Sequence, residues 1–491
     1  MTNYIVENGV KTSAFGEQLV VIPFPTIQFD PVYGLRHKTD TKVLADAAGA
    51  GSVALNTNSN GTKEFKISSG TGANSYCILQ SQRTVRYRPG QGMRFQFTAR
   101  FTQGVAGNTQ SAGAFNFGNE IAFGYNGTSF GILYRSGGLP EIRTLTVTVG
   151  AGGNENATVT LNGVAKVVAV TAGSATLTAA TLAAASYPGW EVSSVGALVT
   201  FVAQNDTAFS GAFTLTSNGT TDGTIATTSA GLTSTSTWIP RSQWNVDHCD
   251  GTGASGFNLD PTKGNVYEIK VQYLGYGQIY FTIEDEVGRM IMVHKINYPN
   301  TNITPSFSLP HFKAGYTSRN TTNTTSISLF AASFAGFIDG DVRMLRNYDS
   351  RSFSKANIGT SSTPILSIRN RLAFNNTWNL TTLELHRIVG AIEGAKPGII
   401  EVIINATLTG AAWTSHEATS SIVEYDTTAT ALTLGANGQV LRSLPLAKSD
   451  SGEILFETLS QVLESTDSIT IAAKASSTTV DVSVAVSWHE D

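Results

Sequence analysis

The sequence predicts a mainly β protein, built as tandem antiparallel β-sandwiches that carry one small α+β insertion. Charged residues make up only 14% of the 491 residues, against about 25% in an ordinary soluble domain. Aromatic residues nevertheless reach 9%, and glycine occupies 48 positions. Short segments that alternate apolar and polar residues recur between Gly and Asn positions. Such alternation is typical of half-buried strands joined by tight turns.

The same composition excludes several other classes of protein. Long helices need Ala, Glu, Lys, Leu and Arg, and disordered chains lack aromatic and β-branched residues. The net charge is −4, so we expect no nucleic-acid binding, which requires many neutralised phosphates. No apolar run approaches 18 residues, and the N-terminus lacks a basic segment followed by an apolar one. We therefore expect neither membrane insertion nor a secretory signal.

The first strands are expected before residue 80, and the alternation becomes clear after residue 83. Residues 94–101 place Phe95, Phe97 and Ala99 on one face and the intervening polar residues on the other. Further short strands are expected at 114–117, 121–125 and 130–134. Close spacing of short strands favours a sandwich.

Residues 143–238 differ in composition from the segments around them. Aromatic residues are fewer there, and Thr, Val and Ala are more frequent. Two strands are expected to meet at an Asn162-Gly163 hairpin turn. Residues 177–185, rich in Ala and Leu, predict a helix that ends before the Pro at 188. Because the aromatic-rich composition returns after this segment, we interpret the ββαββ segment as an insertion.

Aromatic-rich strands return at 266–273 and 278–285, and a second β module begins at residue 364. Residues 341–363 show no clear period and are interpreted as a linker. The expected organisation is an N-terminal arm with first strands (1–80), the first half of a sandwich (81–142), the inserted domain (143–238), the second half of the sandwich (239–340), the linker (341–363) and a C-terminal β-sandwich (364–491).

Cysteine and histidine give little sign of redox or metal chemistry. Cys77 and Cys249 cannot form a disulfide framework, so we expect two buried thiols in a protein made in a reducing cytoplasm. None of the histidines stands at metal-ligand spacing from another. They are His37, His248, His294, His311, His386, His416 and His489. We expect no metal and no cofactor.

One Gly-rich loop concentrates polar residues, and two interpretations of it stay open. Residues 244–260 contain Asp247, His248, Asp250, Asn258 and Asp260. Oxygen ligands from such a loop could hold Ca²⁺, although the spacing of an EF-hand loop is absent. Asp and Asn also set turns by bonding to their own backbone, and this is the interpretation we favour. A pair of catalytic acids, Asp247 and Asp250, is a weaker alternative.

Three other features resemble functional motifs. Ser129 lies in a Gly-x-Ser-x-Gly string, but it lacks the following helix of a nucleophile elbow and is interpreted as a hairpin-turn serine. The acids at 284–286 are expected at a solvated hairpin tip rather than in acid/base work. Tyr276, Trp378 and Trp413 could stack on sugars, although core or interface positions are the favoured interpretation. We therefore expect no catalytic residue and no enzymatic activity, and ligand-binding residues stay unassigned.

Several blocks resemble virion structural proteins of tailed bacteriophages. In the first module they are residues 86–95 (Arg-Tyr-Arg-Pro-Gly-Gln-Gly-Met-Arg-Phe), 123–138, 244–256, 260–267 and 273–279. Blocks at 421–426, 444–448, 469–474 and 488–491 are similar to a C-terminal β module of the same proteins. The first module also resembles a concanavalin-like, jelly-roll sandwich.

This resemblance implies a structural component of a phage particle, of the tail-fibre, spike or capsid-decoration type. Closed symmetric assemblies are the usual state of such chains, so we expect a homo-oligomer, with a homotrimer favoured. Expected partners are other copies, other virion proteins and host-surface glycans, and the expected location is the virion. A tailspike-type polysaccharide-degrading enzyme and a free carbohydrate-binding module are the alternatives. The position on the particle, the symmetry, the receptor and ion binding by the 247–260 loop stay open.

Overall fold

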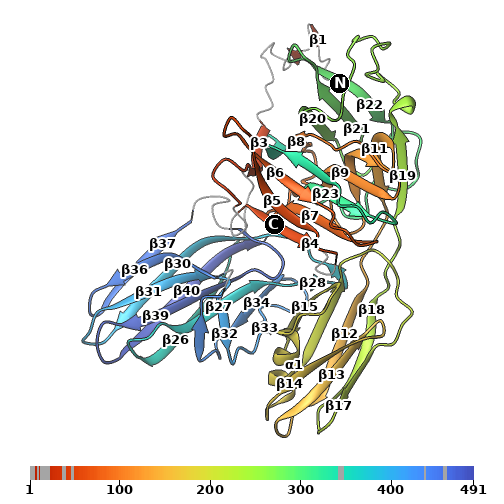
Figure 1. The fold of residues 1–491 in the computed structure, drawn as a ribbon. Helices are drawn as coiled ribbons and strands as arrows, with labels where there is room; N and C mark the ends of the chain where they lie inside the picture. The colour runs from red at the N-terminus through yellow and green to blue at the C-terminus, as the bar shows by residue number, and fades with distance from the viewer. Residues whose placement is uncertain are drawn as a thin grey trace. The chain divides into compact units, whose positions relative to one another are not determined.

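The structure is a computed structural model that describes residues 6–7, 10–11, 23–35, 40–45, 49–340, 348–435, 438–456 and 462–490. Their regular secondary structure is almost entirely antiparallel strand, which confirms the predicted fold class (Figure 1). The chain forms two compact units. Unit 1 comprises Met1–Gly137 and Thr235–Met344, and unit 2 comprises Gly138–Ser234 and Leu345–Asp491.

Unit 1 is built on two large sheets. The seven-stranded sheet has the order β19 (Thr235–Pro240), β11 (Ser129–Ser136), β10 (Glu120–Asn126), β9 (Asn108–Phe115), β23 (Lys313–Asn320), β7 (Tyr76–Ser81) and β4 (Thr41–Ala45). The six-stranded sheet has the order β22 (Met290–Ile296), β21 (Ile279–Glu284), β20 (Asn265–Val271), β8 (Met93–Ala99), β25 (Phe334–Asp339) and β3 (Pro23–Phe29). Two smaller ladders join β24 (Ser328–Ala331), β6 (Lys63–Ser68) and β5 (Ser52–Thr57), and β1 (Val6–Glu7) with β2 (Val10–Lys11). Strands from before and after the inserted segment are neighbours, as in the β9–β23 and β8–β20 pairs.

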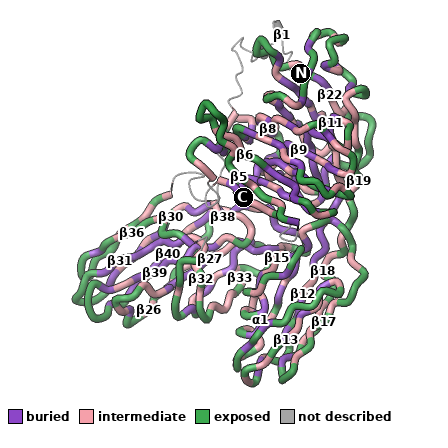
Figure 2. The backbone as a smooth tube through the Cα atoms, viewed as in Figure 1, coloured by how far each residue is buried: buried purple, intermediate pink, exposed green. Residues whose placement is uncertain are grey.

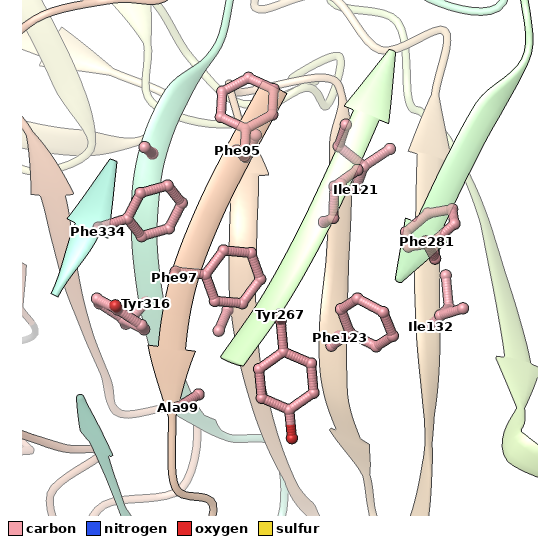
Figure 3. Packing of buried hydrophobic residues seen from close by; sticks show 14 of the residues in the cluster. Phe95, Phe97, Ala99, Ile121, Phe123, Ile132, Tyr267, Phe281, Tyr316 and Phe334 are labelled. Atoms are coloured by element: carbon pink, nitrogen blue, oxygen red, sulfur yellow. The ribbon is translucent and has the colours of Figure 1, made fainter. Parts of the chain in front are cut away.

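Aromatic side chains from both large sheets fill the space between them. Phe95, Phe97 and Ala99 of β8 are buried as their alternation predicts, while the residues between them are partly exposed. The Phe97 ring meets Tyr267 of β20 and Tyr316 of β23 (Figure 3). Edge-to-face and offset contacts of this kind add to the free energy gained by burying the rings. Buried stretches alternate with exposed ones along most strands of the unit (Figure 2).

The two core tyrosines give a matched test of buried hydroxyl groups. Both are fully buried, yet only the Tyr316 hydroxyl is satisfied, 2.8 Å from Ser333 O and 3.1 Å from Thr98 O. The Tyr267 hydroxyl makes no hydrogen bond within the described residues. We expect Tyr316→Phe to lower the free energy of unfolding by about 1–2 kcal/mol, and Tyr267→Phe to leave it unchanged or raise it. Chemical denaturation of the two variants would show this order, and equal losses would contradict it.

In unit 2, the inserted segment carries two sheets and a helix. A four-stranded sheet has the order β15 (Trp190–Val195), β16 (Leu198–Ala203), β12 (Ile142–Val149) and β18 (Asp222–Ser229), and a three-stranded sheet has the order β14 (Val164–Val170), β13 (Glu155–Leu161) and β17 (Thr214–Ser217). The helix α1 (Ala175–Ala183) begins two residues earlier than predicted, because the Ser174 side chain caps it by accepting from Leu177 N. Asn162 and Gly163 both have positive φ values (50° and 82°), which confirms the hairpin turn.

The C-terminal part of unit 2 is a second pair of sheets. One contains β26 (Asp349–Ile358), β40 (Val480–Glu490), β30 (Leu383–Glu393) and β37 (Asp450–Leu455), with β38 (Val462–Leu463) also on β30. The other has the order β33 (Thr414–Ser415), β34 (Val423–Asp426), β27 (Thr363–Asn370), β39 (Ser468–Ala475), β31 (Gly398–Ile404) and β36 (Gln439–Leu446). Two short ladders pair β28 (Ala373–Phe374) with β29 (Thr377–Trp378) and β32 (Thr407–Thr409) with β35 (Ala431–Thr433).

The interpretation of residues 341–363 as a linker needs correction over 349–358. These residues form β26, an edge strand paired with the last strand β40. The strand was missed because an edge strand buries few side chains, and here only Ile358 is buried in the core while Phe353 packs against it. Residues 341–347 lie outside the described residues.

Candidate functional site

The 244–260 loop is a series of turns held by its own acidic side chains. Asp247 is buried, and its two oxygens accept from Cys249 N (2.8 Å) and Ser255 N (2.9 Å). Asp250 accepts from Thr252 N and Oγ1 (2.9 and 2.6 Å), and Asp260 repeats the pattern with Thr262. These are the bonds expected of turn-setting residues.

Arg241 holds the same loop through three of its backbone carbonyl oxygens. Its guanidinium donates to the carbonyl oxygens of His248 (2.7 Å), Leu259 (3.0 Å) and Cys249. His248 Nδ1 is 4.0 Å from Asp250 Oδ2, so the two predicted candidates are brought together only loosely. Within the described residues, no group of three or more His, Cys, Asp or Glu side chains is arranged to hold a metal.

Asp247 is the loop residue whose loss we expect to matter most. Burial alone would raise the pKa of its carboxyl, but the bonds from Ser255 and Cys249 outweigh burial and lower it. The carboxylate therefore stabilises the fold above its unfolded pKa of about 3.9, and that stability is lost as the pH falls through the lower folded value. Asp247→Asn turns an N–H towards a backbone N–H, and we expect a loss of about 1–3 kcal/mol in unfolding free energy.

Asp250→Asn is the matched control for this substitution. Asp250 uses only Oδ1 in the two bonds to Thr252, and an Asn oxygen can replace it. Thermal unfolding of both variants should show a clear loss for Asp247→Asn alone. A loss of similar size in the control would contradict the turn role assigned to Asp247.

The two thiols lie in the core, as predicted. Cys77 and Cys249 are both buried and unpaired. Burial raises the pKa of each thiol to about 12, helped at Cys249 by the charge of Asp247. Both groups therefore stay protonated at neutral pH and are poor nucleophiles.

Ser129 and the acids at 284–286 are turn residues. Ser129 pairs with Asn126 across the β10–β11 hairpin, and its hydroxyl accepts from Trp238 Nε1 (3.3 Å). Asp285 closes the β21–β22 hairpin by accepting from Arg289 N (2.8 Å), Arg289 Nε (2.8 Å) and Val287 N (3.0 Å). The backbone bond from Arg289 is the main cause that lowers the pKa of Asp285. Ser129 therefore flanks a hairpin turn, as expected. Asp285 also holds a turn, but it does so as a buried carboxylate, so the expected solvated tip is wrong for this residue.

The three candidate sugar-stacking aromatics are in different situations. Trp378 is buried. Trp413 lies against the Arg369 guanidinium, 4.2 Å from its ring centre, and Arg369 also pairs with Glu424 (2.6 Å) and donates to Ser194 O. Only Tyr276 has an exposed side chain, with its hydroxyl donating to Ile303 O. The favoured interpretation, a packing role, therefore holds for Trp378 and Trp413.

A site that the sequence did not suggest lies on the outer face of the seven-stranded sheet. The register places alternate residues of each strand away from the aromatic core. At the centre of this face the outward positions hold no large side chain: they are Gly131, Gly124 and Ser111 in one row and Ala122, Gly113 and Gly315 in the next. We call these six residues the glycine floor.

Close backbone approach explains the glycines of this floor. A Cβ atom on any of the four would lie 1.8–2.3 Å from a carbonyl oxygen of the neighbouring strand. Such contacts are far below van der Waals distance, so only glycine fits there. These four glycines and Ala122 are nevertheless buried, so neighbouring side chains cover this strip of backbone.

Charged side chains surround the glycine floor. Glu120 is buried, and it reaches along β10 to accept from Ser111 Oγ (2.9 Å) and to pair with Arg135 Nη2 (3.1 Å). On the far side, Arg319 of β23 lies over the ring of Tyr76, 5.0 Å from its centre. The charges of Glu120 and Arg135 act on the pKa of Arg319, which the surrounding protein lowers by desolvation. The Glu120–Arg135 pair thus lies at one edge of the glycine floor, and Arg319, over the Tyr76 ring, lies in the row beyond Ser111.

Only part of this site could have been found in the sequence. The outward positions of β10 follow from the alternation of Ile121, Phe123 and Tyr125, and glycine at such positions is a usable signal. The pairing of β9 with β23 joins residues some 200 positions apart, as in Arg319 with Thr109. No local pattern specifies that pairing.

No family model and no curated protein matches this chain. Solved structures similar to it include a protein of unknown function from Shewanella oneidensis MR-1 (9% identity, TM-score 0.27, 65% of this chain and 89% of that one) and the lectin from Bauhinia forficata in complex with GalNAc (9%, 0.20, 65% and 98%). Another is a protein of the triple jelly roll and turret assembly of an archaeal virus (7%, 0.15, 95% and 97%). At these values the likeness concerns β-sheet architecture and carries no functional argument.

Proposed function

We propose that this chain is a structural, non-enzymatic protein of a virus particle, of the tail-fibre, spike or capsid-decoration type, which contacts host-surface glycans. One observation carries the proposal. The acids that stood out as candidates are used by the fold: Asp247, Asp250, Asp260 and Asp285 hold turns, and Glu120 is in an ion pair. A chain whose acids are structural fits a building block better than a catalyst.

The proposed partners are other copies of the chain, other virion proteins and a cell-surface glycan, and the proposed location is the virion. The low charged fraction supports assembly, because charged side chains are depleted at interface cores. A net charge of −4 speaks against nucleic acid as a partner. Among the described residues, no helix has the length and hydropathy to cross a bilayer.

The first test is the mass of the purified full chain in solution, combined with the protein content of purified particles. Sedimentation velocity at micromolar concentration should give a homo-oligomer, with a trimer expected, and mass spectrometry should find the chain in particles. A stable monomer that is absent from particles would overturn the proposal.

A free saccharide-binding protein is the second candidate, and the exposed ring of Tyr276 favours it, because an aromatic face can stack on a sugar. It predicts the same glycan contact but no place in a particle, so particle composition separates the two. A tailspike-type depolymerase is tested by incubation with host polysaccharide. Release of new reducing ends would replace both binding functions with an enzymatic one.

A further inference from the structure

Two neighbouring loops of unit 1 expose large apolar side chains. Residues 272–278 join β20 to β21, and residues 297–312 join β22 to β23. Leu274 is 69% exposed, Tyr276 41% and Ile303 96%, the highest value for a large apolar side chain among the described residues. Single exposed apolar residues are common on protein surfaces, whereas adjacent ones are typical of an interaction surface.

The two loops are joined, so these side chains belong to one surface. The Tyr276 hydroxyl donates to Ile303 O (3.1 Å), and Ser306 N donates to Gly275 O (2.8 Å). We call Leu274, Tyr276 and Ile303 the apolar loop patch. Because hydrogen bonds between the loops fix their backbones, little conformational freedom is left to lose when a partner binds.

Leu274 is exposed at a conformational cost. Its φ is 36°, in the left-handed region that bulky side chains rarely adopt. Gly275 (φ 79°) and Gly277 complete the tight turn, and a Cβ atom on Gly277 would collide with Gln272 O. An apolar residue that is both strained and exposed gains little within its own chain, so its favourable contact is expected outside the chain.

The charge pattern of the two loops indicates which partner fits the patch. Residues 271–283 and 296–310 contain no Asp, Glu, Lys or Arg. Residues near the symmetry axis of a dimer or ring meet their own copies, so a charged side chain there would face a like charge and oppose association. A patch without charge therefore suits contact with a second copy. Interface centres are also depleted of charge and enriched in aromatic residues.

We propose that the apolar loop patch is a self-contact, at which copies of this chain meet around the symmetry axis of a homo-oligomer. The inference rests on the proposed function, which expects a homo-oligomer, and it names the surface that holds the copies together. Leu274 and Ile303 pack against the same residues of neighbouring copies, and burial of these side chains drives the association.

Sedimentation velocity of the full chain, at micromolar concentration, tests this contact. The unmodified chain should sediment as an oligomer. Ile303→Asp and Ile303→Lys should each weaken association by about a hundredfold or more, because like charges then meet at the axis. An equimolar mixture of the two variants should regain part of the association at low salt, because opposite charges then meet. Such rescue is expected only where Ile303 meets its own copy.

Val287→Asp is the matched control, since Val287 is a 75% exposed apolar residue at the β21–β22 hairpin. It should associate as the unmodified chain does, and circular dichroism should show the same folded spectrum for every variant. An unchanged oligomer in Ile303→Asp, or a mixture without rescue, would overturn the inference and leave the homo-oligomer standing. Unchanged mass combined with lost binding to a glycan array would assign the patch to a saccharide instead.

A monomeric unmodified chain would overturn both this contact and the proposed homo-oligomer. The virion role is judged separately by particle composition. An oligomer that dissociates in Ile303→Asp but is absent from particles would therefore support the contact and contradict the virion role.

Discussion

Replacing Phe97 by Ala should lower the unfolding free energy of unit 1 by about 3–5 kcal/mol. The ring is 2% exposed and stacks on Phe334 (4.9 Å between centres) and Tyr267 (5.7 Å) of the six-stranded sheet. It also meets Tyr316 of the seven-stranded sheet at 6.4 Å. Truncation leaves a cavity between rigid rings that cannot collapse into it, so most of the contact energy is lost.

Hydrogen exchange followed by mass spectrometry would locate this loss. Peptides from β8 and β20 should exchange faster in Phe97→Ala, while peptides from the C-terminal sheets of unit 2 keep their rates. Tyr33→Ala is the control, because that ring is 88% exposed and such changes shift stability by less than about 0.5 kcal/mol. Equal effects of the two substitutions would show that the aromatic core does not hold unit 1 together.

Replacing His294 by Gln should remove a pH dependence of stability between about pH 6.5 and 4. His294 of β22 is buried, and burial lowers the pKa of its imidazole to about 4. The unfolded chain, with a pKa of about 6.5, binds the proton first as the pH falls. The stability contributed by the neutral ring is therefore complete above pH 6.5 and declines towards pH 4, by roughly 3 kcal/mol in total.

Glutamine suits this test because it keeps an acceptor for Asn245 N, which donates to His294 Nδ1 at 3.2 Å. Unfolding curves recorded across pH 4–7 should flatten in His294→Gln. Met292 of the same strand, which is exposed and does not titrate, provides the control, and Met292→Gln should keep the original profile. An unchanged profile in His294→Gln would show that other groups cause the acid sensitivity.

Local features of this protein followed from the sequence because they depend on neighbours in the chain. The alternation of Phe95, Phe97 and Ala99 predicted a strand and its buried face, and the structure has both. The Asn162-Gly163 turn was also predicted, because only a few residue types adopt positive φ at low cost. The same holds for Asp247 and Asp285, whose carboxylates bond to backbone a few residues away.

Features that depend on distant partners were predicted poorly or not at all. Strand β26 looked like a linker, since its pairing with β40 joins residues some 130 positions apart and buries few of its side chains. Trp413 was expected to pack in a core or at an interface, but its partner, Arg369 of another strand, could not be predicted. In both cases the deciding contact comes from another strand, and no period within the segment records it.

The sequence by itself determined the all-β class, the faces of the strongest strands and the turn role of the acidic loop. Each of these is set by side-chain period and by hydrogen bonds within a few residues. The glycine floor and the Glu120–Arg135 pair were decided only by the tertiary structure. They exist because the register of β9, β10, β11 and β23 brings outward positions from distant segments onto one face. Register depends on the packing of the opposite, aromatic face, so the arrangement of this outer face is a consequence of the core.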